Sequence, residues 1–180
     1  MKKIDTSLAG VFVLEPRVFG DERGFFLESY NQRVMTTLGI QERFVQDNHS
    51  YSTCNVVRGL HFQTEHAQGK LVRVIVGEIL DVVVDLRRGS PTFGKWEAVT
   101  LSEENRRMIW IPPGLAHGFR VASAGAHVLY KATDFYSPQH ERTLLWNDED
   151  LRIDWQLKGT PIVSAKDQAG IPFRRISTFE

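Results

Sequence analysis

The sequence has one cysteine, no net charge and no long apolar run. Cys54 alone cannot form an internal disulfide or a Cys-rich zinc site, and a lone cysteine suits a reducing compartment. The 22 basic and 22 acidic residues balance, so no net field attracts nucleic acid or an anionic membrane. No apolar run approaches the ~18 residues of a membrane span, and Met1-Lys2-Lys3 leads into a mixed segment rather than a signal-peptide core. We expect a soluble, cytoplasmic protein with neither a nucleic-acid nor a membrane partner.

The chain also lacks internal repeats, low-complexity tracts and linkers. A chain of 180 residues can bury one hydrophobic core and is short for two. We therefore expect a single domain covering residues 1–180.

Short runs rich in valine and isoleucine dominate the chain, separated by Gly and Pro turns, and few segments have a helical pattern. This pattern predicts an all-β sandwich or jelly roll with a few short helices and a ligand site in its open mouth. A helix is predicted over residues 31–38, with Asn31 as its cap and Gly39 at its end. A short turn at Gly77-Glu78 predicts that residues 71–86 form a hairpin. Strands are predicted over residues 10–14, 44–48, 56–63, 71–76, 79–86, 95–101, 108–111 and 126–133.

The run R-G-L-H-F-Q, residues 58–63, carries a histidine and an arginine on one short strand. Simple alternation places Arg58 and His61 on opposite faces. Both side chains reach one ligand only if the chain bends between them, and Gly59 is the expected place, since glycine within a strand often marks a bulge or a close approach. By itself, His61 fits a core histidine satisfied by a backbone carbonyl better than a catalytic residue.

A second informative run is P-P-G-L-A-H-G-F, residues 112–119. Two prolines and a glycine make a rigid turn that delivers His117 to the mouth of the next strand. Asp81 and Asp85 share one face of a neighbouring strand. We expect them at a wet or ligand-facing surface, because unpaired carboxylates are costly in a dry core.

The titratable residues favour proton transfer. A histidine such as His61 can remove a proton near neutral pH if a carboxylate, here Asp167, fixes its tautomer and stabilises the imidazolium. Lys70 can stabilise an oxyanion, and Tyr130 can return a proton from elsewhere in the cavity. Together these residues suit proton abstraction beside a carbonyl group followed by reprotonation.

Five separated motifs, in this order along nearly the whole chain, resemble the dTDP-4-dehydrorhamnose 3,5-epimerase family. They are F-G-D-E-R-G-F-F-L-E, R-G-L-H-F-Q followed by Lys70, P-P-G-L-A-H-G-F, Y-K-A-T-D-F-Y and S-A-K-D. The resemblance implies a cupin-type double-stranded β-helix, a homodimer and no cofactor. It implies an isomerase that converts dTDP-4-dehydro-6-deoxy-D-glucose to dTDP-4-dehydro-L-rhamnose, a step toward the L-rhamnose of bacterial surface polysaccharides such as lipopolysaccharide O-antigen.

Carried over by position, the resemblance makes His61 the base, Asp167 its partner, Tyr130 the acid and Lys70 the cation beside the enolate. It assigns Arg23 and Glu28 to the nucleotide in the neighbouring subunit's site. A pyrophosphate on an otherwise neutral protein needs such placed donors, and Phe26 or Tyr136 can stack on thymine or sugar. The further substrate-binding positions are Gln46, Asn48, Arg58, His117, Tyr136, Glu141 and Lys166.

Three alternatives stay open on the sequence. One is a metal-dependent cupin enzyme using His61, His66, His117 and a carboxylate from Glu65 or Glu78. Gln63 argues against it, because an amide oxygen is a poor substitute for imidazole on a transition metal, and we expect no metal site. The others are a sugar-nucleotide-binding module without turnover and an epimerase that acts on one carbon or on another deoxysugar nucleotide.

Overall fold

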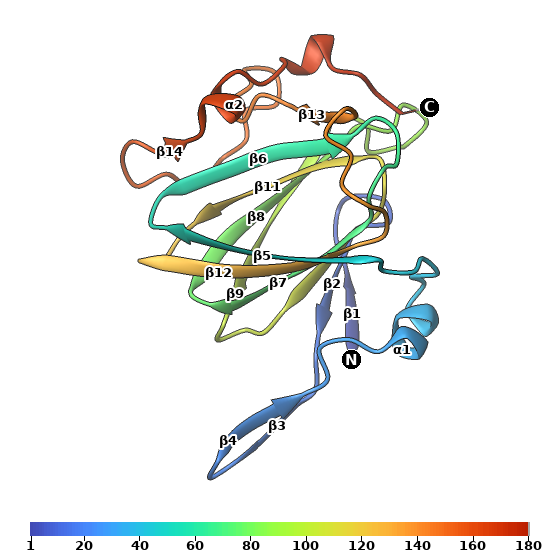
Figure 1. The fold of residues 1–180 in the computed structure, drawn as a ribbon, viewed down its shortest axis with the longest axis vertical. Helices are drawn as coiled ribbons and strands as arrows, with labels where there is room; N and C mark the ends of the chain where they lie inside the picture. Colours follow the sequence, from blue (N-terminus) through green and yellow to red (C-terminus); the bar gives the residue numbers. More distant parts are fainter. Residues whose placement is uncertain (180) are drawn as a thin grey trace.

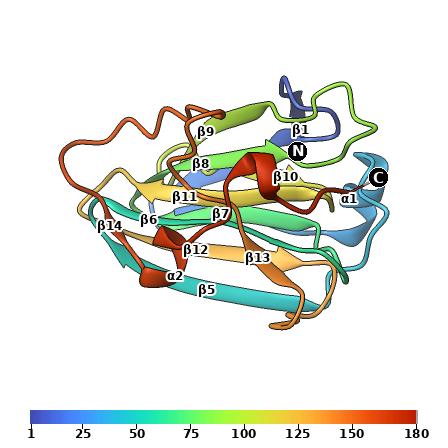
Figure 2. The same cartoon turned by 90° about the horizontal axis from the view of Figure 1, so that it is seen from above.

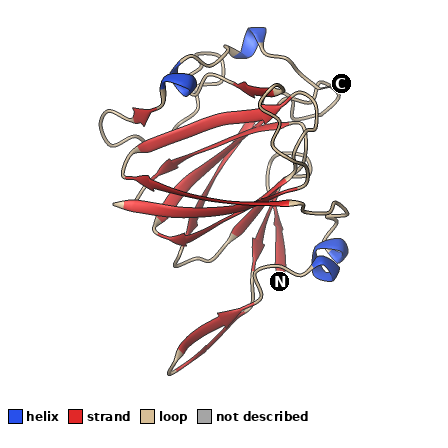
Figure 3. Cartoon of the chain, in the orientation of Figure 1, coloured by secondary structure: helices blue, strands red, loops and turns tan. Residues whose placement is uncertain are grey.

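Two six-stranded sheets face each other in the computed structural model, which describes residues 1–179 (Figure 1). The first sheet has the order β1-β2-β10-β7-β12-β5, and the second β13-β6-β11-β8-β9 with β14 paired to β6. The mainly β jelly-roll prediction is confirmed, and Figure 3 shows the short helices at the margins of the β body. The strands are β1 (Lys2–Asp5), β2 (Phe12–Glu15), β3 (Val18–Asp21), β4 (Gly24–Leu27), β5 (Gln46–Thr53), β6 (Val56–Gln63), β7 (Lys70–Val76), β8 (Glu78–Asp85), β9 (Trp96–Ser102), β10 (Met108–Ile111), β11 (Leu115–Val121), β12 (Gly125–Ala132), β13 (Glu141–Thr143) and β14 (Ile162–Val163), and the helices are α1 (Gln32–Thr37), α2 (Ala165–Gln168) and the 3-10 turn η1 (Phe173–Arg175).

Three apolar clusters hold these layers together. The central cluster lies between the sheets and includes Val72 and Val83. A second cluster, which includes Leu60 and Trp155, joins the outer face of the second sheet to the C-terminal third of the chain. Figure 2 shows the part of the chain after β13 lying across the sheet. Both faces of the second sheet are therefore buried, which explains why consecutive residues are buried along β8 after Glu78 and along all of β11.

The predicted helix is confirmed as α1. The Asn31 side chain accepts hydrogen bonds from the backbone N–H groups of Arg33 and Val34, and Gly39 follows the helix with φ +101°. The helix buries Met35 in the third apolar cluster, against the outer face of the first sheet. No helix within residues 1–179 is long and apolar enough to cross a membrane.

The predicted hairpin over residues 71–86 is wrong. β7 pairs with β10 and β12 in the first sheet, whereas β8 pairs with β9 and β11 in the second. The chain crosses between sheets at Gly77, where φ is +80° and an added Cβ would lie 2.0 Å from the Gly125 carbonyl oxygen. Both strands are apolar on the face toward the common core, so hydrophobic pattern cannot distinguish strands that pair from strands that face each other.

The strand predicted over residues 44–48 begins at Gln46 and continues to Thr53. Its second half, Ser50 to Thr53, has few apolar residues: Tyr51 and Thr53 are exposed, and the less exposed side carries Ser50 and Ser52. Hydrophobic alternation therefore could not indicate it.

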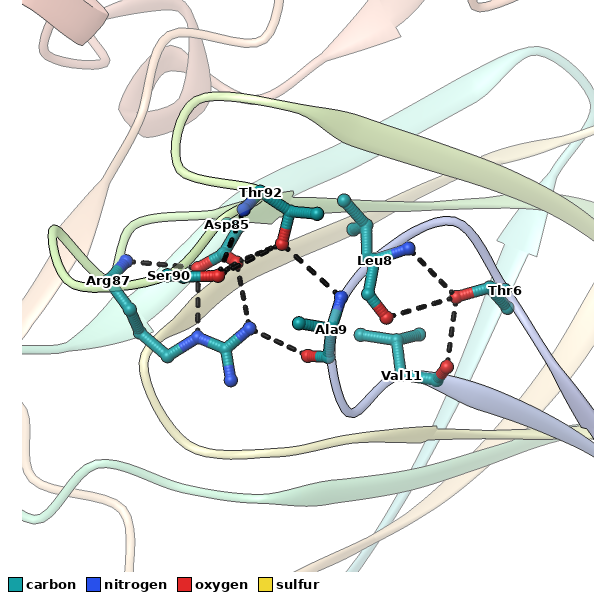
Figure 4. Close-up of polar contacts among 8 residues, drawn as sticks. All are labelled: Thr6, Leu8, Ala9, Val11, Asp85, Arg87, Ser90 and Thr92. Atoms are coloured by element: carbon teal, nitrogen blue, oxygen red, sulfur yellow. Dashed lines mark hydrogen bonds and ion pairs between the residues drawn. The ribbon is translucent and has the colours of Figure 1, made fainter.

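The expectation that Asp81 and Asp85 lie at a wet or ligand-facing surface is also wrong, since both are fully buried. Hydrogen-bond partners compensate for the free-energy cost of burying these carboxylates. Asp85 accepts hydrogen bonds from Arg87, Ser90 and Thr92 (Figure 4). Arg87 also donates to the Ala9 carbonyl oxygen at 2.7 Å, so the network ties the N-terminal loop to the end of β8.

The β3–β4 hairpin projects from the body of the protein (Figure 1). Phe19, Phe25 and Phe26 expose 51%, 58% and 69% of their surface. Exposed aromatic rings gathered on a projecting element are typical of an interaction site.

Candidate active site

His61 and Asp167 form a close pair although they are 106 residues apart in the sequence. The His61 Nε2 atom lies 2.6 Å from Asp167 Oδ1. The other carboxylate oxygen accepts the Gly59 backbone N–H at 3.2 Å, and Ser164 caps the short helix α2 that carries Asp167. Burial acts to raise the pKa of Asp167, but its bonds to His61 and to the Gly59 N–H outweigh that effect and lower it. Asp167 is therefore an anion beside the imidazole.

The strand β6 bends at Gly59, as the sequence predicts. Val57, Leu60 and Phe62 all pack in the outer apolar cluster. Strict alternation would put Val57 on the opposite face from Leu60 and Phe62, so the alternation of side-chain faces shifts by one residue between Val57 and Leu60. Gly59 has φ +118° and the register with β11 shifts beside it. Arg58 and His61 therefore line the same hollow, together with Lys166 and Asp167.

Gly59 is also a point of close approach between strands. An added Cβ at Gly59 would lie 2.6 Å from the Gly118 Cα, and one at Gly118 would lie 2.5 Å from the Arg58 carbonyl oxygen. The two glycines let β6 and β11 approach where the bulge forms.

Lys70 lies at the start of β7 in the cavity that also contains His61 and Tyr130. Its Nζ atom is 3.5 Å from the His61 carbonyl oxygen. Burial lowers the pKa of Lys70 to about 8, against the opposing charges of Asp81 and Glu141. The ammonium group is therefore still protonated at neutral pH, in a site where its charge is poorly screened.

His117 lies opposite His61 in the pairing of β6 with β11. The structure places it inside the strand and buried, not at the mouth that the sequence indicated. Its Nε2 atom is 2.8 Å from Asp81 Oδ2, and this partner in the neighbouring strand β8 makes its burial possible. The other Asp81 oxygen is buried without a hydrogen-bond partner in the described part of the chain.

Tyr130 reaches the cavity from β12, in the opposite sheet. Burial and the charge of Glu141 raise the pKa of Tyr130, and Arg58 lowers it by less. Its phenol is thus protonated at neutral pH and able to act as an acid. In the pairing with β5, Tyr130 lies opposite Asn48, whose Nδ2 atom is buried and has no partner within residues 1–179. Gln46 donates to Asn48 Oδ1 at 2.9 Å.

Glu141, Tyr136 and Lys166 form a polar cluster beside the cavity. The Tyr136 hydroxyl donates to Glu141 Oε2 at 2.7 Å, and Lys166 Nζ is 2.5 Å from the same oxygen. Burial acts to raise the pKa of Glu141, but the bonds from Lys166 and Tyr136 prevail and lower it. The Tyr136 ring is half exposed, which leaves a face free for stacking.

Six predicted site residues are absent from the lining of both cavities that contain His61, namely Gln46, Asn48, His117, Arg23, Phe26 and Glu28, and the last three lie on or beside the projecting hairpin. Arg23 and Phe26 are on the projecting hairpin, where Arg23 pairs with Asp21. Glu28 follows the hairpin and accepts a hydrogen bond from Asn31 at 3.0 Å.

The histidines proposed for a metal site do not converge. His61 pairs with Asp167, His117 with Asp81, and His66 with Asp134. Within residues 1–179 no group of three or more His, Cys, Asp or Glu side chains could hold a metal ion.

Sequence reasoning did not predict the supporting roles of three polar residues at the site. Asp81 holds His117, Ser52 accepts a hydrogen bond from Arg58 Nε at 2.8 Å, and Gln63 bonds to the loop that contains Tyr136. For Asp81 a signal was present: a carboxylate within an otherwise apolar strand indicates a buried partner.

The comparisons with known proteins agree over the whole chain. The family profile described as dTDP-4-dehydrorhamnose 3,5-epimerase matches residues 5–175. Proteins of that name from Pseudomonas aeruginosa and Salmonella typhimurium are 55% and 58% identical to this chain, over 99% and 92% of both chains. The crystal structure of a dTDP-6-deoxy-D-glucose-3,5-epimerase from Legionella pneumophila in complex with dTDP-4-keto-L-rhamnose is similar with a TM-score of 0.95. It is 49% identical, and the match covers 98% of this chain and 94% of that one. The chain belongs to the dTDP-4-dehydrorhamnose 3,5-epimerase family.

Proposed function

We propose that the chain converts dTDP-4-dehydro-6-deoxy-D-glucose to dTDP-4-dehydro-L-rhamnose by inverting C3 and C5, in dTDP-L-rhamnose biosynthesis. The observation that carries this proposal is the arrangement around one cavity of a carboxylate-paired histidine, a buried lysine and a protonated phenol. Residues 1–180 act as one epimerase domain.

The chemistry follows from the ketone at C4, which acidifies the hydrogens on C3 and C5. His61 removes each proton in turn, and Asp167, bonded to its imidazole at 2.6 Å, stabilises the imidazolium that forms. Lys70 stabilises the developing enolate oxygen, because its charge acts in a desolvated site. Tyr130 then supplies a proton from the opposite sheet, so the carbon is reprotonated on its other face. Proton exchange with solvent returns His61 to its neutral form and Tyr130 to its phenol form before the second inversion. A positioned acid and a positioned base each contribute about 10²- to 10⁴-fold.

The nucleotide and its pyrophosphate occupy the adjoining hollow lined by Arg58 and Lys166. Both side chains can donate charge-assisted hydrogen bonds to phosphate oxygens. Tyr136 stacks on the nucleotide or the sugar. Gln46, Asn48, His117 and Glu141 make the remaining substrate contacts.

The functional unit is a homodimer in which each β3–β4 hairpin extends to the neighbouring subunit's site. Supporting this, Arg23 and Phe26 are exposed on a projecting hairpin and lie outside the chain's own cavity. Arg23 and Glu28 bind the nucleotide there, and Phe26 packs beside it.

Mixed dimers test this arrangement. His61→Ala and Arg23→Ala subunits are each expected to be impaired alone. Dimers that combine them contain one site with an intact His61 and an intact neighbouring hairpin, so mixing equal amounts should restore about a quarter of the wild-type activity. Without restored activity in verified mixed dimers, the hairpin does not serve the neighbouring site.

The reaction itself is tested by incubating the protein with dTDP-4-dehydro-6-deoxy-D-glucose in D₂O and following the ring protons by NMR. Deuterium at both C3 and C5, with the L-configured product trapped by a reductase, supports the double epimerase. Deuterium at one carbon indicates a single-centre epimerase. No exchange indicates a binding module without turnover and overturns the proposal.

We also place the reaction in the cytoplasm. The exposed, free thiol of Cys54 suits a reducing compartment. The product would serve the synthesis of L-rhamnose for surface polysaccharides such as lipopolysaccharide O-antigen.

A further inference from the structure

The loop that contains Tyr136 is held by side chains rather than by a strand ladder. It joins β12 to β13 and has no regular secondary structure over residues 134–137. The Tyr136 backbone N–H donates to Gln46 Oε1 at 3.0 Å, and the Ser137 N–H donates to Gln63 Oε1 at 2.9 Å. The backbone on both sides of the Tyr136 Cα atom is thus bonded to glutamine side chains.

Gln63 also bonds to the loop at the residue before Tyr136. Gln63 Nε2 donates to the Phe135 carbonyl oxygen at 3.2 Å and to the His66 carbonyl oxygen at 2.8 Å. A further glutamine, Gln68, donates to the Asp134 carbonyl oxygen at 2.8 Å. Since both N–H groups of the Gln63 amide donate and its oxygen accepts, its orientation is fully determined.

Gln63 is well suited to this task. It ends β6 two residues after His61 and is 4% exposed, so its bonds are shielded from competing water. Through it, the loop that contains Tyr136 is tied to the strand that contains the base. The arrangement also uses both N–H groups of the amide and one of the two acceptor positions of its oxygen on the protein itself, leaving little for a ligand.

We infer that Gln63 is a positioning residue: it fixes the backbone around Tyr136 and so holds that ring at the mouth of the cavity, at a set distance from His61. The inference rests on the proposed function for the contact that Tyr136 makes with substrate. The structural part, that Gln63 orders the loop, stands on the hydrogen bonds alone.

The decisive variant is Gln63→Leu, which keeps a similar size and removes all three hydrogen bonds. The first measurement is amide hydrogen exchange of the full-length protein. We expect exchange at Tyr136 and Ser137 to become at least about tenfold faster, because protection follows the free energy of local opening. Unchanged protection at both amides would overturn the inference, whether or not the protein turns over a sugar nucleotide.

Asn105 supplies the matched control. Its side-chain amide also makes three bonds to backbone, to the N–H groups of Ser102 and Arg107 and to the carbonyl of Thr100, but in the turn between β9 and β10. Asn105→Leu should leave exchange at Tyr136 and kcat/KM unchanged. An equal effect of the two variants would mean that general destabilisation, not positioning, is responsible.

The second measurement is a double-mutant cycle on kcat/KM for dTDP-4-dehydro-6-deoxy-D-glucose. Gln63→Leu should lower kcat/KM by about 10- to 100-fold through misplacement of the ring. The same change made in a Tyr136→Ala background should cost much less, because the group being positioned is gone. An undiminished cost in that background would overturn the inference, whereas a wild-type protein without turnover would overturn only the proposed function.

If Gln63→Leu does not fold, Gln63→Glu takes its place. The carboxylate keeps an acceptor for the Ser137 N–H but directs an oxygen at the carbonyls of Phe135 and His66, so the loop should open in the same way. Wild-type exchange and a wild-type kcat/KM in this variant would contradict the positioning role.

Discussion

Replacing Asp85 by asparagine should destabilise the protein substantially while leaving the cavity residues in place. The Asp85 carboxylate is fully buried and accepts hydrogen bonds from Arg87, Ser90 and Thr92 at 2.6 to 3.0 Å. Asparagine has a similar shape but removes the charge. It also turns an N–H group toward donors, leaving polar groups unsatisfied.

The size of the effect follows from the pKa of this carboxyl group. Burial acts to raise it, but the bonds from Arg87, Ser90 and Thr92 lower it from 3.8 to about 2. This corresponds to roughly 2 kcal/mol of stability when the group is ionised. The unpaired Arg87 guanidinium, whose side chain is 24% exposed, adds to the loss. Together they predict a decrease in the free energy of unfolding of about 3 kcal/mol at pH 7.

The pH dependence gives the sharper test. The folded-state pKa of Asp85 lies below its unfolded value, so its contribution is complete above about pH 4 to 5 and is lost as the pH falls toward 2. At pH 3 the stabilisation contributed by Asp85 should be smaller by about 1 kcal/mol than at pH 7. The difference in unfolding free energy between the wild type and Asp85→Asn should shrink by that amount.

Urea unfolding followed by tryptophan fluorescence measures this, since Trp110 and Trp155 are buried. All variants should be measured at the same protein concentration, because the free energy of unfolding of a dimer depends on that concentration. Asp47→Asn serves as control: its carboxylate is 72% exposed and paired with Lys131, so its loss should cost less than about 1 kcal/mol. An Asp85→Asn cost as small as this, or a difference independent of pH, would refute the reasoning.

Three further predictions concern the reaction. Asp167→Asn should lower kcat by roughly 10²- to 10⁴-fold, since the His61 imidazolium loses its counter-charge; a decrease below about tenfold, with unchanged melting, would contradict the pairing. Tyr130→Phe should impair product formation in a stopped-flow or NMR assay much more than nucleotide binding, and an unchanged product yield would rule out its role as acid. Because burial lowers the pKa of Lys70 to about 8, kcat/KM should fall above about pH 8 as the cation loses its proton. Lys70→Arg should move that limb to higher pH because arginine stays charged, and an alkaline limb that stays in place would exclude Lys70 as its origin.

The sequence predicted local structure well where a local cause decides it. Asn31 caps α1 because its side chain reaches the first turn, and Gly59 bends β6 because only glycine tolerates both the φ of +118° and the contact with Gly118. The pairing of β7 and β8 was not predictable in this way. Which sheet a strand joins depends on contacts between distant segments, and both strands have the same apolar pattern.

The same distinction applies to the site. From the sequence, the chemical roles of the residues around His61 could be proposed and the family could be identified from the motifs. The surroundings of Asp81 and Gln63 could not be predicted, because they depend on residues that are neighbours only in the folded protein. Asp81 can be buried in the core only because His117, in the adjacent strand, is its hydrogen-bond partner. In the sequence, Gln63 showed only that a second metal-ligating histidine is missing at its position. Its bonds to the loop of Tyr136 became evident only from the fold.

The distribution of charge supports the proposal that a protein without net charge binds the dianionic pyrophosphate of its substrate. In the hollow beside His61, Lys166 is already paired with Glu141 at 2.5 Å. Arg58, in contrast, bonds only to the Ser52 hydroxyl and the Tyr51 carbonyl oxygen, with no carboxylate partner in the described part of the chain. Its charge is therefore available to phosphate oxygens without first breaking an ion pair. In the proposed complex Lys166 exchanges Glu141 for a phosphate oxygen, so we expect Arg58 to supply most of the affinity for the pyrophosphate and Lys166 to couple binding to the cluster that contains Tyr136.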